Sequence, residues 1–360
     1  MTVPIGQILG SDNLIGAIKR IASGLPNPLP TGLFTTTEAV TKDYAKIRTW
    51  AGSRANANVV SYGSPAVRAD KIGLDERAIK LIHEFEYQAF PMDTLINLNS
   101  MSSETLQNKG VEEVGRQTAE FAQRFQNSRI SMVASALSKG KIYVEAEGTI
   151  ATVSDNAVIT VDFKIPAGQK SQVGGIIGTS WANVAVDIQG DVAALKRKMF
   201  EVSGKMPKFA FYGANIAGYL LGNTVLKNLL NILPTQANAM FRGETIPDGT
   251  LGLTWIDCSN MFMLSGTTVV NWFGADDIAL TPDIDSSWWR MLEGSTLVPT
   301  DIGRVGATVE EMVSSLREVN GMFSYAVQTN NPAGATQYFG DTVLPTIVNP
   351  GSLIIVDVVP

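Results

Sequence analysis

Residues 103–138 read SETLQNKGVEEVGRQTAEFAQRFQNSRISMVASALS, and the rest of the chain must be arranged around this stretch. Its small or apolar residues recur every three or four positions, which is the spacing of one face of a helix. The members of this stripe are Val114, Thr118, Phe121, Ala122, Phe125, Met132, Val133 and Ala136. A helix over residues 111–138 would be roughly 40 Å long. The sequence therefore predicts a single long helix with one buried face.

The ends of this helix carry ordinary signals. Gly140 stands just past the last periodic residue, where a left-handed residue closes a helix. Near the start, Glu112 and Glu113 favour the positive end of the helix dipole, while Gly110 leaves a start as early as Glu104 open. Because Gln126 and Arg129 interrupt the stripe, a sustained coiled-coil seam is excluded, and we expect the helix to lie across a sheet.

The composition is that of a folded protein without a basic face. The chain has 360 residues, of which 45% are hydrophobic and 17% charged, enough for two or three domains with their own cores. Its net charge of −6 argues against a dedicated nucleic-acid binder, so any contact with nucleic acid should be weak. No stretch resembles a signal peptide or a membrane span, which indicates a cytosol-like compartment and no membrane partner.

Residues that could carry chemistry are sparse. A single cysteine and a single histidine exclude an internal disulfide, a thiolate metal cluster and a multi-histidine metal site, so we interpret Cys258 and His83 as packing residues. The sequence holds no phosphate-binding loop, no G-x-S-x-G elbow and no H-E-x-x-H motif. We therefore predict no catalytic, cofactor-binding or metal-binding residue. An alternative is a hydrolase or sugar-binding enzyme that uses Asp276, Asp277 and the nearby tryptophans.

The segments before the long helix are expected to need a partner. A short helix around residues 11–22 precedes LPNPLP, whose prolines favour either an extended arm that crosses onto a neighbouring subunit or a disordered tail. Residues 35–82 form two extended runs around a tip rich in Gly, Ser, Asn and Ala. Since a lone hairpin is not stable in water, we expect this one to rest on another chain.

The segments after the long helix alternate between strands and helices. Strands are predicted in 141–153 and 157–166, followed by a helix that Asp187 caps and Gly204 closes. The apolar run KFAFYG precedes a helix over 214–233 that should stop at Pro234. Short strands are expected within 247–282, and the final run SLIIVDVV is an apolar strand. The fold class is α+β.

This order of elements resembles the tailed-phage major capsid proteins of the lambda head protein (capsid protein E) type, which have the Hong Kong 97-type fold. PKFAFYGANIAGYLLGNTVLKNLL is similar to a strand, turn and helix of their axial domain, and WFGADDIALTPDI to a later acidic turn and strand. The regions that the resemblance implies are an N-terminal arm (1–34), an extended loop (35–84), a peripheral domain (85–182) with its spine helix (104–138), an axial domain (183–328) and a strand returning to the peripheral domain (329–360).

The resemblance implies a structural role. The chain would be a major capsid protein that assembles through hexamers and pentamers into an icosahedral shell around double-stranded DNA. It would be made in the host cytoplasm and located in the virion, with a separate scaffolding protein, a portal and a decoration protein as partners. An encapsulin nanocompartment shell is a second alternative. The residues predicted to form contacts between subunits are Trp50, Val59, Val60 and Tyr62 in the hairpin and Leu25, Pro26 and Leu29 in the arm.

Overall fold

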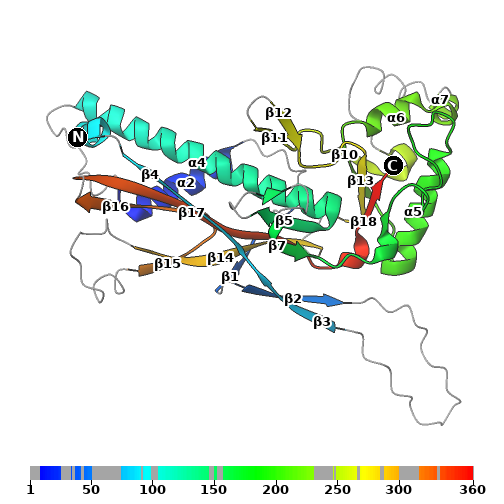
Figure 1. Ribbon diagram of the computed structural model, residues 1–360, viewed down its shortest axis with the longest axis horizontal. Helices are drawn as coiled ribbons and strands as arrows, with labels where there is room; N and C mark the ends of the chain where they lie inside the picture. The colour runs from blue at the N-terminus through cyan, green and yellow to red at the C-terminus, as the bar shows by residue number, and fades with distance from the viewer. Residues whose placement is uncertain are drawn as a thin grey trace, which may run out of the picture.

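The computed structural model describes residues 9–25, 34, 37–41, 44–50, 74–90, 92–98, 104–145, 150–151, 157–230, 246, 249–265, 268–283, 288–299, 316–330 and 333–359. One helix, α4 (Glu104–Lys139), runs along a six-stranded sheet, and a second, five-stranded sheet lies near its carboxyl end (Figure 1). No helix in the described part of the chain is long and apolar enough to cross a membrane.

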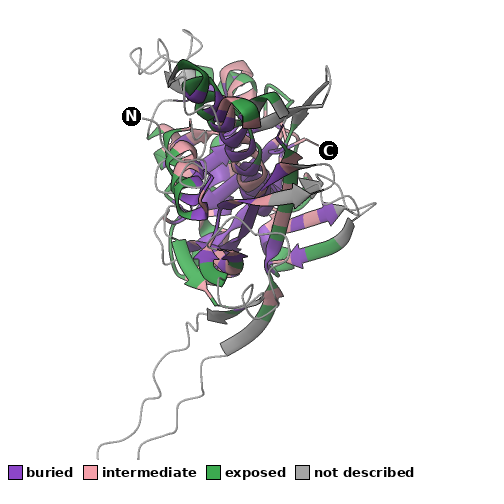
Figure 2. Cartoon of the chain, turned by 90° about the vertical axis from the view of Figure 1, so that its left-hand side faces the viewer, coloured by how far each residue is buried: buried purple, intermediate pink, exposed green. Residues whose placement is uncertain are grey.

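The predicted long helix is confirmed. α4 has 36 residues and starts at the earlier of the two positions that the sequence left open. All eight members of its stripe are buried, and buried residues gather between this helix and the strands (Figure 2). Gly110 lies inside α4, at the point where the short helix α3 (Met92–Leu98) packs against it. A Cβ at this position would lie 2.8 Å from Leu98 Cγ, so the close approach of α3 requires a glycine here. At the other end Gly140 has a φ of +64°, as expected of a closing glycine.

The six-stranded sheet collects strands from distant parts of the chain. Its central strand β17 pairs with β16 and β4 along most of its length and with β14 near its carboxyl end, while β14 also pairs with β1 and β15. The bounds are β1 (Thr37–Val40), β4 (Ile82–Ala89), β14 (Trp289–Pro299), β15 (Leu316–Asn320), β16 (Phe323–Asn330) and β17 (Ala333–Ile347). One face of β17 packs against α4, where the rings of Phe121 and Phe339 stack with centroids 4.0 Å apart.

The amino-terminal helix α2 (Ser11–Gly24) confirms the predicted short helix. It packs against both α4 and β16, with Ile18 fully buried in a cluster that includes Phe121 and Phe125. The described part of residues 1–34 therefore packs largely against the rest of its own subunit.

The five-stranded sheet is built from strands that follow α4 in the chain. Its order is β10 (Thr254–Asp257), β9 (Phe209–Tyr212), β13 (Asp277–Thr281), β18 (Ile354–Asp357) and β8 (Lys170–Ser171). Helix α5 (Ile188–Ser203) belongs to the hydrophobic core on this sheet, and its predicted ends are confirmed, since Asp187 accepts a hydrogen bond from Gly190 N and Gly204 has a φ of +74°. The described part of the chain also contains short 3₁₀ helices at Ala167–Gln169, Thr250–Gly252 and Pro350–Ser352.

Three smaller sheets complete the described strands. β2 (Tyr44–Trp50) and β3 (Leu74–Lys80) form the predicted hairpin, which projects from the body (Figure 1). β5 (Lys141–Glu145) pairs with β6 (Ile150–Ala151) and β7 (Ala157–Asp162). The structure therefore has three strands where the sequence predicted two. β11 (Phe262–Ser265) pairs with β12 (Thr268–Asn271).

The helix expected over residues 214–233 is wrong in one respect, because it is broken at Asn223 into α6 (Ile216–Gly222) and α7 (Thr224–Leu230). Asn223 has an extended backbone, and its buried side chain accepts a hydrogen bond from Leu226 N and donates one to Val186 O. An asparagine that bonds to the backbone in this way favours a cap over a helix interior. The expected stop at Pro234 lies outside the described residues.

The strand pairings cross the boundaries of the expected division of the chain, which stays a prediction. Within 329–360, β17 pairs with β4 in the six-stranded sheet, and the terminal strand β18 lies between β13 and β8 in the five-stranded sheet, so this segment meets strands from both of the expected domains. Conversely, β14, β15 and most of β16 fall within 183–328 but pair in the sheet that contains β4. Strands buried on both faces look alike in sequence, which is why composition did not assign them to one sheet or the other.

Candidate functional site

The chain segments directly before and after the hairpin of β2 and β3 are both anchored to the body. Before it, Glu38 of β1 forms an ion pair with Arg290 of β14 at 2.9 Å. After it, only the buried Leu81 separates β3 from β4. Gly294 of β14 makes room for this residue, because a Cβ at Gly294 would lie 2.6 Å from Leu81 Cδ1. The six-stranded sheet therefore fixes the root of the hairpin.

The residues predicted to contact other subunits lie mostly outside the described residues. Those outside are Pro26, Leu29, Val59, Val60 and Tyr62. Trp50 is the last residue of β2, opposite Leu74 at the end of the hairpin farther from the root. Leu25 is half-buried against the cluster that α2 forms beneath α4. Their role in contacts between subunits remains a prediction.

A buried arginine joins α4 to the six-stranded sheet. The Arg129 guanidinium donates to Asp341 of β17 through Nε at 2.6 Å and Nη2 at 2.8 Å, and to Glu293 of β14 through Nη2 at 3.2 Å. Burial alone would lower the pKa of Arg129, but the charges of Asp341 and Glu293 raise it above its ordinary value. The guanidinium therefore stays charged, and two carboxylates neutralise it.

A third carboxyl group adjoins this cluster. Glu84 of β4 lies opposite Asp341 in the strand register, and its Oε2 atom is enclosed without a hydrogen-bond partner in the described part of the chain. Burial, reinforced by the charge of Asp341, raises the pKa of Glu84 to about 8. The root of the hairpin thus meets α4 through a group that is protonated at neutral pH.

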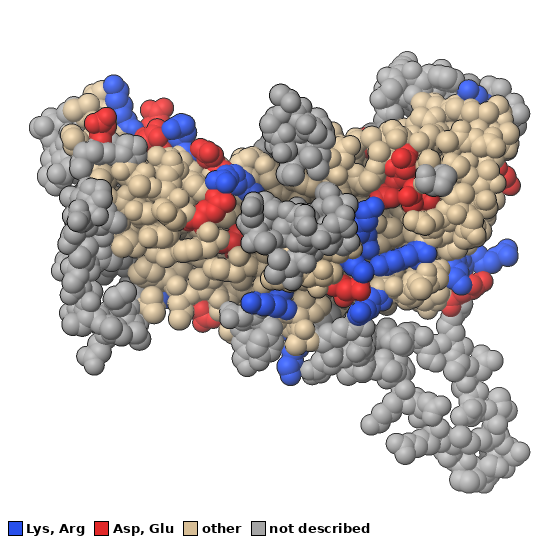
Figure 3. All heavy atoms as spheres, viewed as in Figure 1, with Lys and Arg blue, Asp and Glu red and all other residues tan. Residues whose placement is uncertain are grey.

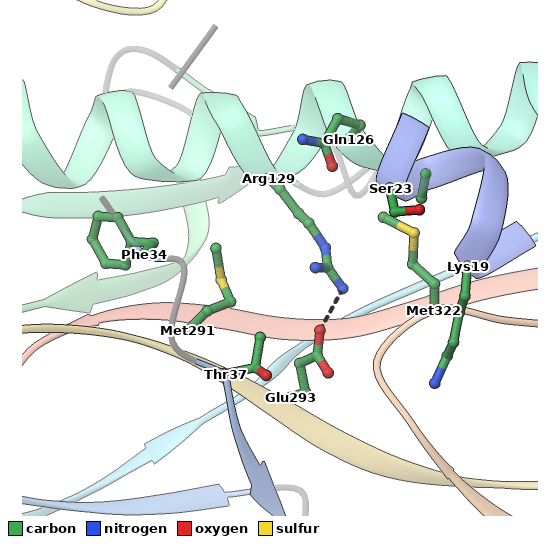
Figure 4. A pocket seen from close by; sticks show the side chains of 10 residues that line it. Lys19, Ser23, Phe34, Thr37, Gln126, Arg129, Met291, Glu293 and Met322 are labelled. Atoms are coloured by element: carbon green, nitrogen blue, oxygen red, sulfur yellow. Dashed lines mark hydrogen bonds and ion pairs between the residues drawn. The ribbon is translucent and has the colours of Figure 1, made fainter. Parts of the chain in front are cut away.

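A cavity of about 300 Å³ opens beside Arg129 (Figure 4). It lies between α2, α4 and β14, and the side chains that line it include Lys19, Gln126, Met291, Glu293 and Met322. Arg129 and Glu293 point toward one another beside the cavity, joined by their ion pair (Figure 4). Since the guanidinium is already occupied by two carboxylates, the arrangement stabilises the fold and offers no activated nucleophile or base.

At the carboxyl end of α4, Lys139 forms an ion pair with Asp277 of β13 at 3.2 Å. Burial raises the pKa of Asp277, and the charge of Lys139 opposes that effect. The neighbouring Asp276 accepts hydrogen bonds from Asn215 Nδ2 at 3.0 Å and Tyr219 OH at 2.7 Å. Both carboxylates of the enzyme hypothesis therefore make structural contacts between elements.

The tryptophans of the enzyme hypothesis are not placed to stack on a ligand. Trp272, Trp288 and Trp289 are all buried in the main hydrophobic cluster. Cys258 is buried in the same cluster, which confirms the interpretation of this residue as a packing residue. His83 is exposed, and its Nδ1 lies 2.7 Å from Thr342 Oγ1.

The sheet face opposite α4 carries a row of aromatic rings that our sequence analysis missed. The rings of Phe85 and Tyr338 stack at 5.6 Å, and those of Tyr338 and Tyr325 at 5.1 Å. Phe85 and Tyr87 are 47% and 69% exposed. The alternation in HEFEYQA, residues 83–89, is the signal that could have revealed it, because every second side chain of a strand shares one face.

Comparison with known families settles what kind of protein this is. A family model described as phage major capsid protein E matches residues 11–290, well over half of the chain. The chain belongs to the phage major capsid protein E family. No curated protein matches it. As a member of this capsid family, it is a structural protein and a component of a phage virion.

Solved structures support the fold of this capsid protein. A protein described as the capsid protein of an Escherichia coli CFT073 prophage is 12% identical, with a TM-score of 0.57, and the match covers 97% of this chain and 99% of that one. A phage-related protein from Bordetella bronchiseptica RB50 is 12% identical, with a TM-score of 0.51, covering 95% and 96%. At such low identity the likeness concerns the fold alone, which is the predicted Hong Kong 97-type fold.

Proposed function

We propose that copies of this capsid protein assemble through rings of five and six subunits into a closed icosahedral shell around double-stranded DNA. The observation that carries the proposal is the projecting hairpin. It is anchored at its root, and among the described strands β2 and β3 pair only with each other. A two-stranded ribbon has little stability alone, so a neighbouring subunit supplies the surface that it needs. Assembly and folding are then coupled.

The surface charge fits a container that does not hold its DNA tightly. On the face seen in Figure 3, acidic and basic side chains of the described residues lie interspersed. With a net charge of −6, the subunit makes weak, non-specific contacts with packaged DNA. A separate scaffolding protein, a portal and a decoration protein are the further partners of this proposal, and assembly takes place in the host cytoplasm before the shell becomes part of the virion.

The test replaces residues 50–62, which include Trp50, Val59, Val60 and Tyr62, with a short Gly-Ser turn. The variant should keep the circular dichroism of the parent but form no closed shells when light scattering and electron microscopy follow assembly. Gly115→Ala, a change on the exposed face of α4, is the control and should assemble normally. Normal shells from the hairpin variant would refute the proposed role of the hairpin. Shells filled with an enzyme in place of DNA would favour the nanocompartment alternative.

A further inference from the structure

Glu84 stands where three parts of the subunit meet. It belongs to β4, which continues the hairpin after the single residue Leu81. Across the sheet it faces Asp341 of β17, a fully buried carboxylate. Above them, Arg129 of α4 bonds to Asp341 and to Glu293 of β14. We name these four residues, Glu84, Arg129, Glu293 and Asp341, the carboxyl cluster.

The charges of the carboxyl cluster do not balance if every group is ionised. Arg129 contributes one positive charge, and Asp341 and Glu293 each contribute a negative one, so these three alone leave a net charge of −1. An ionised Glu84 would bring a second uncompensated negative charge into an enclosed site. Uncompensated charge in a low-dielectric interior is costly, and a buried group avoids the cost by becoming neutral.

The other groups around Glu84 do not remove this imbalance. From α4, the hydroxyl of Ser128 donates a hydrogen bond to Glu84. Arg124, also on α4, forms its ion pair with Glu86 at 2.6 Å. Glu86, on the same face of β4, adds a further negative charge. His83 points to the opposite face, where its ring lies beside Thr342. Burial and the charge of Asp341 dominate, and they raise the pKa of Glu84 to about 8.

We propose that the carboxyl cluster is a proton-controlled latch, which holds β4 and the hairpin root against α4 while Glu84 carries its proton. When β4 separates from α4 and from its pairing with β17, Glu84 reaches solvent and its proton passes to water. The O–H bond of the carboxyl group is the only covalent bond that breaks. Because the hairpin continues from β4, the proton controls how firmly the hairpin is held. An effect of this proton on shell assembly, through the hairpin, rests on the proposed function. The latch itself is a property of the single subunit.

The direction of the pH dependence follows from linkage. Glu84 has an ordinary carboxyl pKa when exposed and a raised pKa when the latch is closed, so the closed state binds more protons. The latch is tightest in acid and loses stability as the pH rises toward the raised pKa. Opening should increase by about tenfold per pH unit up to about pH 8 and level off above it.

Hydrogen exchange on the purified full-length subunit tests this inference. The readout is the protection of the backbone amides in residues 82–89, corrected for the intrinsic effect of pH on exchange, from about pH 6 to about pH 9. In the wild type, protection should fall by about tenfold per pH unit up to about pH 8 and then level off. Glu84→Gln, which has nearly the same shape but cannot ionise, should show constant protection. Glu86→Gln, one pleat away on the same face, should retain the wild-type slope.

A second measurement does not depend on any variant folding well. The infrared spectrum of the wild-type subunit at neutral pH should contain a protonated carboxyl band that disappears as the pH is raised, and Glu84→Gln should lack it. Equal pH slopes in wild type and Glu84→Gln, or the absence of the band in the wild type, would overturn the latch. Since neither readout needs a shell, failure here would leave the assembly proposal standing, and failure to assemble would leave the latch standing.

Discussion

Arg129 of α4 and Asp341 of β17 lie 212 residues apart in the sequence and form a two-point ion pair in the structure. The Arg129 side chain is 14% exposed and that of Asp341 is fully buried. Removing one partner of such a pair leaves an uncompensated charge in the interior.

We predict that Arg129→Met lowers the free energy of unfolding by about 3–5 kcal/mol. Arg124→Met is the matched control on the same helix, since Arg124 forms an ion pair with Glu86 but its side chain is 53% exposed. The control should change stability by about 0–1 kcal/mol. Urea unfolding of dissociated subunits measures both. Equal losses in the two variants would contradict the view that burial makes the Arg129 pair important.

Two glycines of α4 should respond to alanine in opposite directions. Gly115 is exposed with open space around it, so Gly115→Ala should stabilise the subunit by up to about 1 kcal/mol through helix propensity. At Gly110 the same Cβ would lie 3.0 Å from Leu98 N of α3, and overpacking should cost roughly 1–3 kcal/mol. Thermal unfolding of both variants measures the difference. If Gly110→Ala were also stabilising, α3 would not be packed closely on α4.

Gly140→Ala should be destabilising for two separable reasons. Its φ of +64° strains any residue with a Cβ, and that Cβ would overlap Ile165 Cδ1. Together these effects should cost about 2–5 kcal/mol. Combining it with Ile165→Val removes the overlapping atom and should recover part of the loss. Gly174→Ala, where φ is +93° and nothing lies nearby, isolates the strain alone. No recovery in the double variant would mean that strain accounts for the whole effect.

Cys258 should be inert to thiol reagents in the folded subunit. Its side chain is buried, and burial raises the pKa of the thiol well above the ordinary value, so the reactive thiolate is scarce. We expect no labelling by a maleimide in native buffer and complete labelling in denaturant, as followed by mass spectrometry. Rapid labelling of the native subunit would indicate that the main cluster opens readily.

The sequence predicted those elements whose signals are local. The stripe of α4 and the caps of α5 at Asp187 and Gly204 depend on residues within a few positions of one another, and the structure confirms both. The hairpin was also predictable, because its two runs flank a tip of small polar residues. The family resemblance rested on the order of these elements.

What the sequence did not predict depends on partners far along the chain. Arg129 looked like an interruption of the stripe, because Glu293 and Asp341 are 164 and 212 residues away. The place of β18 depends on which strands it meets, and an apolar run does not encode that. Asn223 broke a predicted helix because Val186, on another segment, accepts its side-chain hydrogen bond.

The central position of β17 has a consequence for how the protein is made. The ribosome completes α4 long before it reaches Asp341, the partner of Arg129, which follows 212 residues later. At ordinary rates of synthesis this interval lasts about 10 to 40 seconds. Throughout it the part of the stripe that packs on β17, including Phe121, lacks that strand, while α2 and β5 are already available to cover other parts of the helix. The nascent chain is therefore exposed to aggregation during most of its synthesis, while many other copies are being translated nearby.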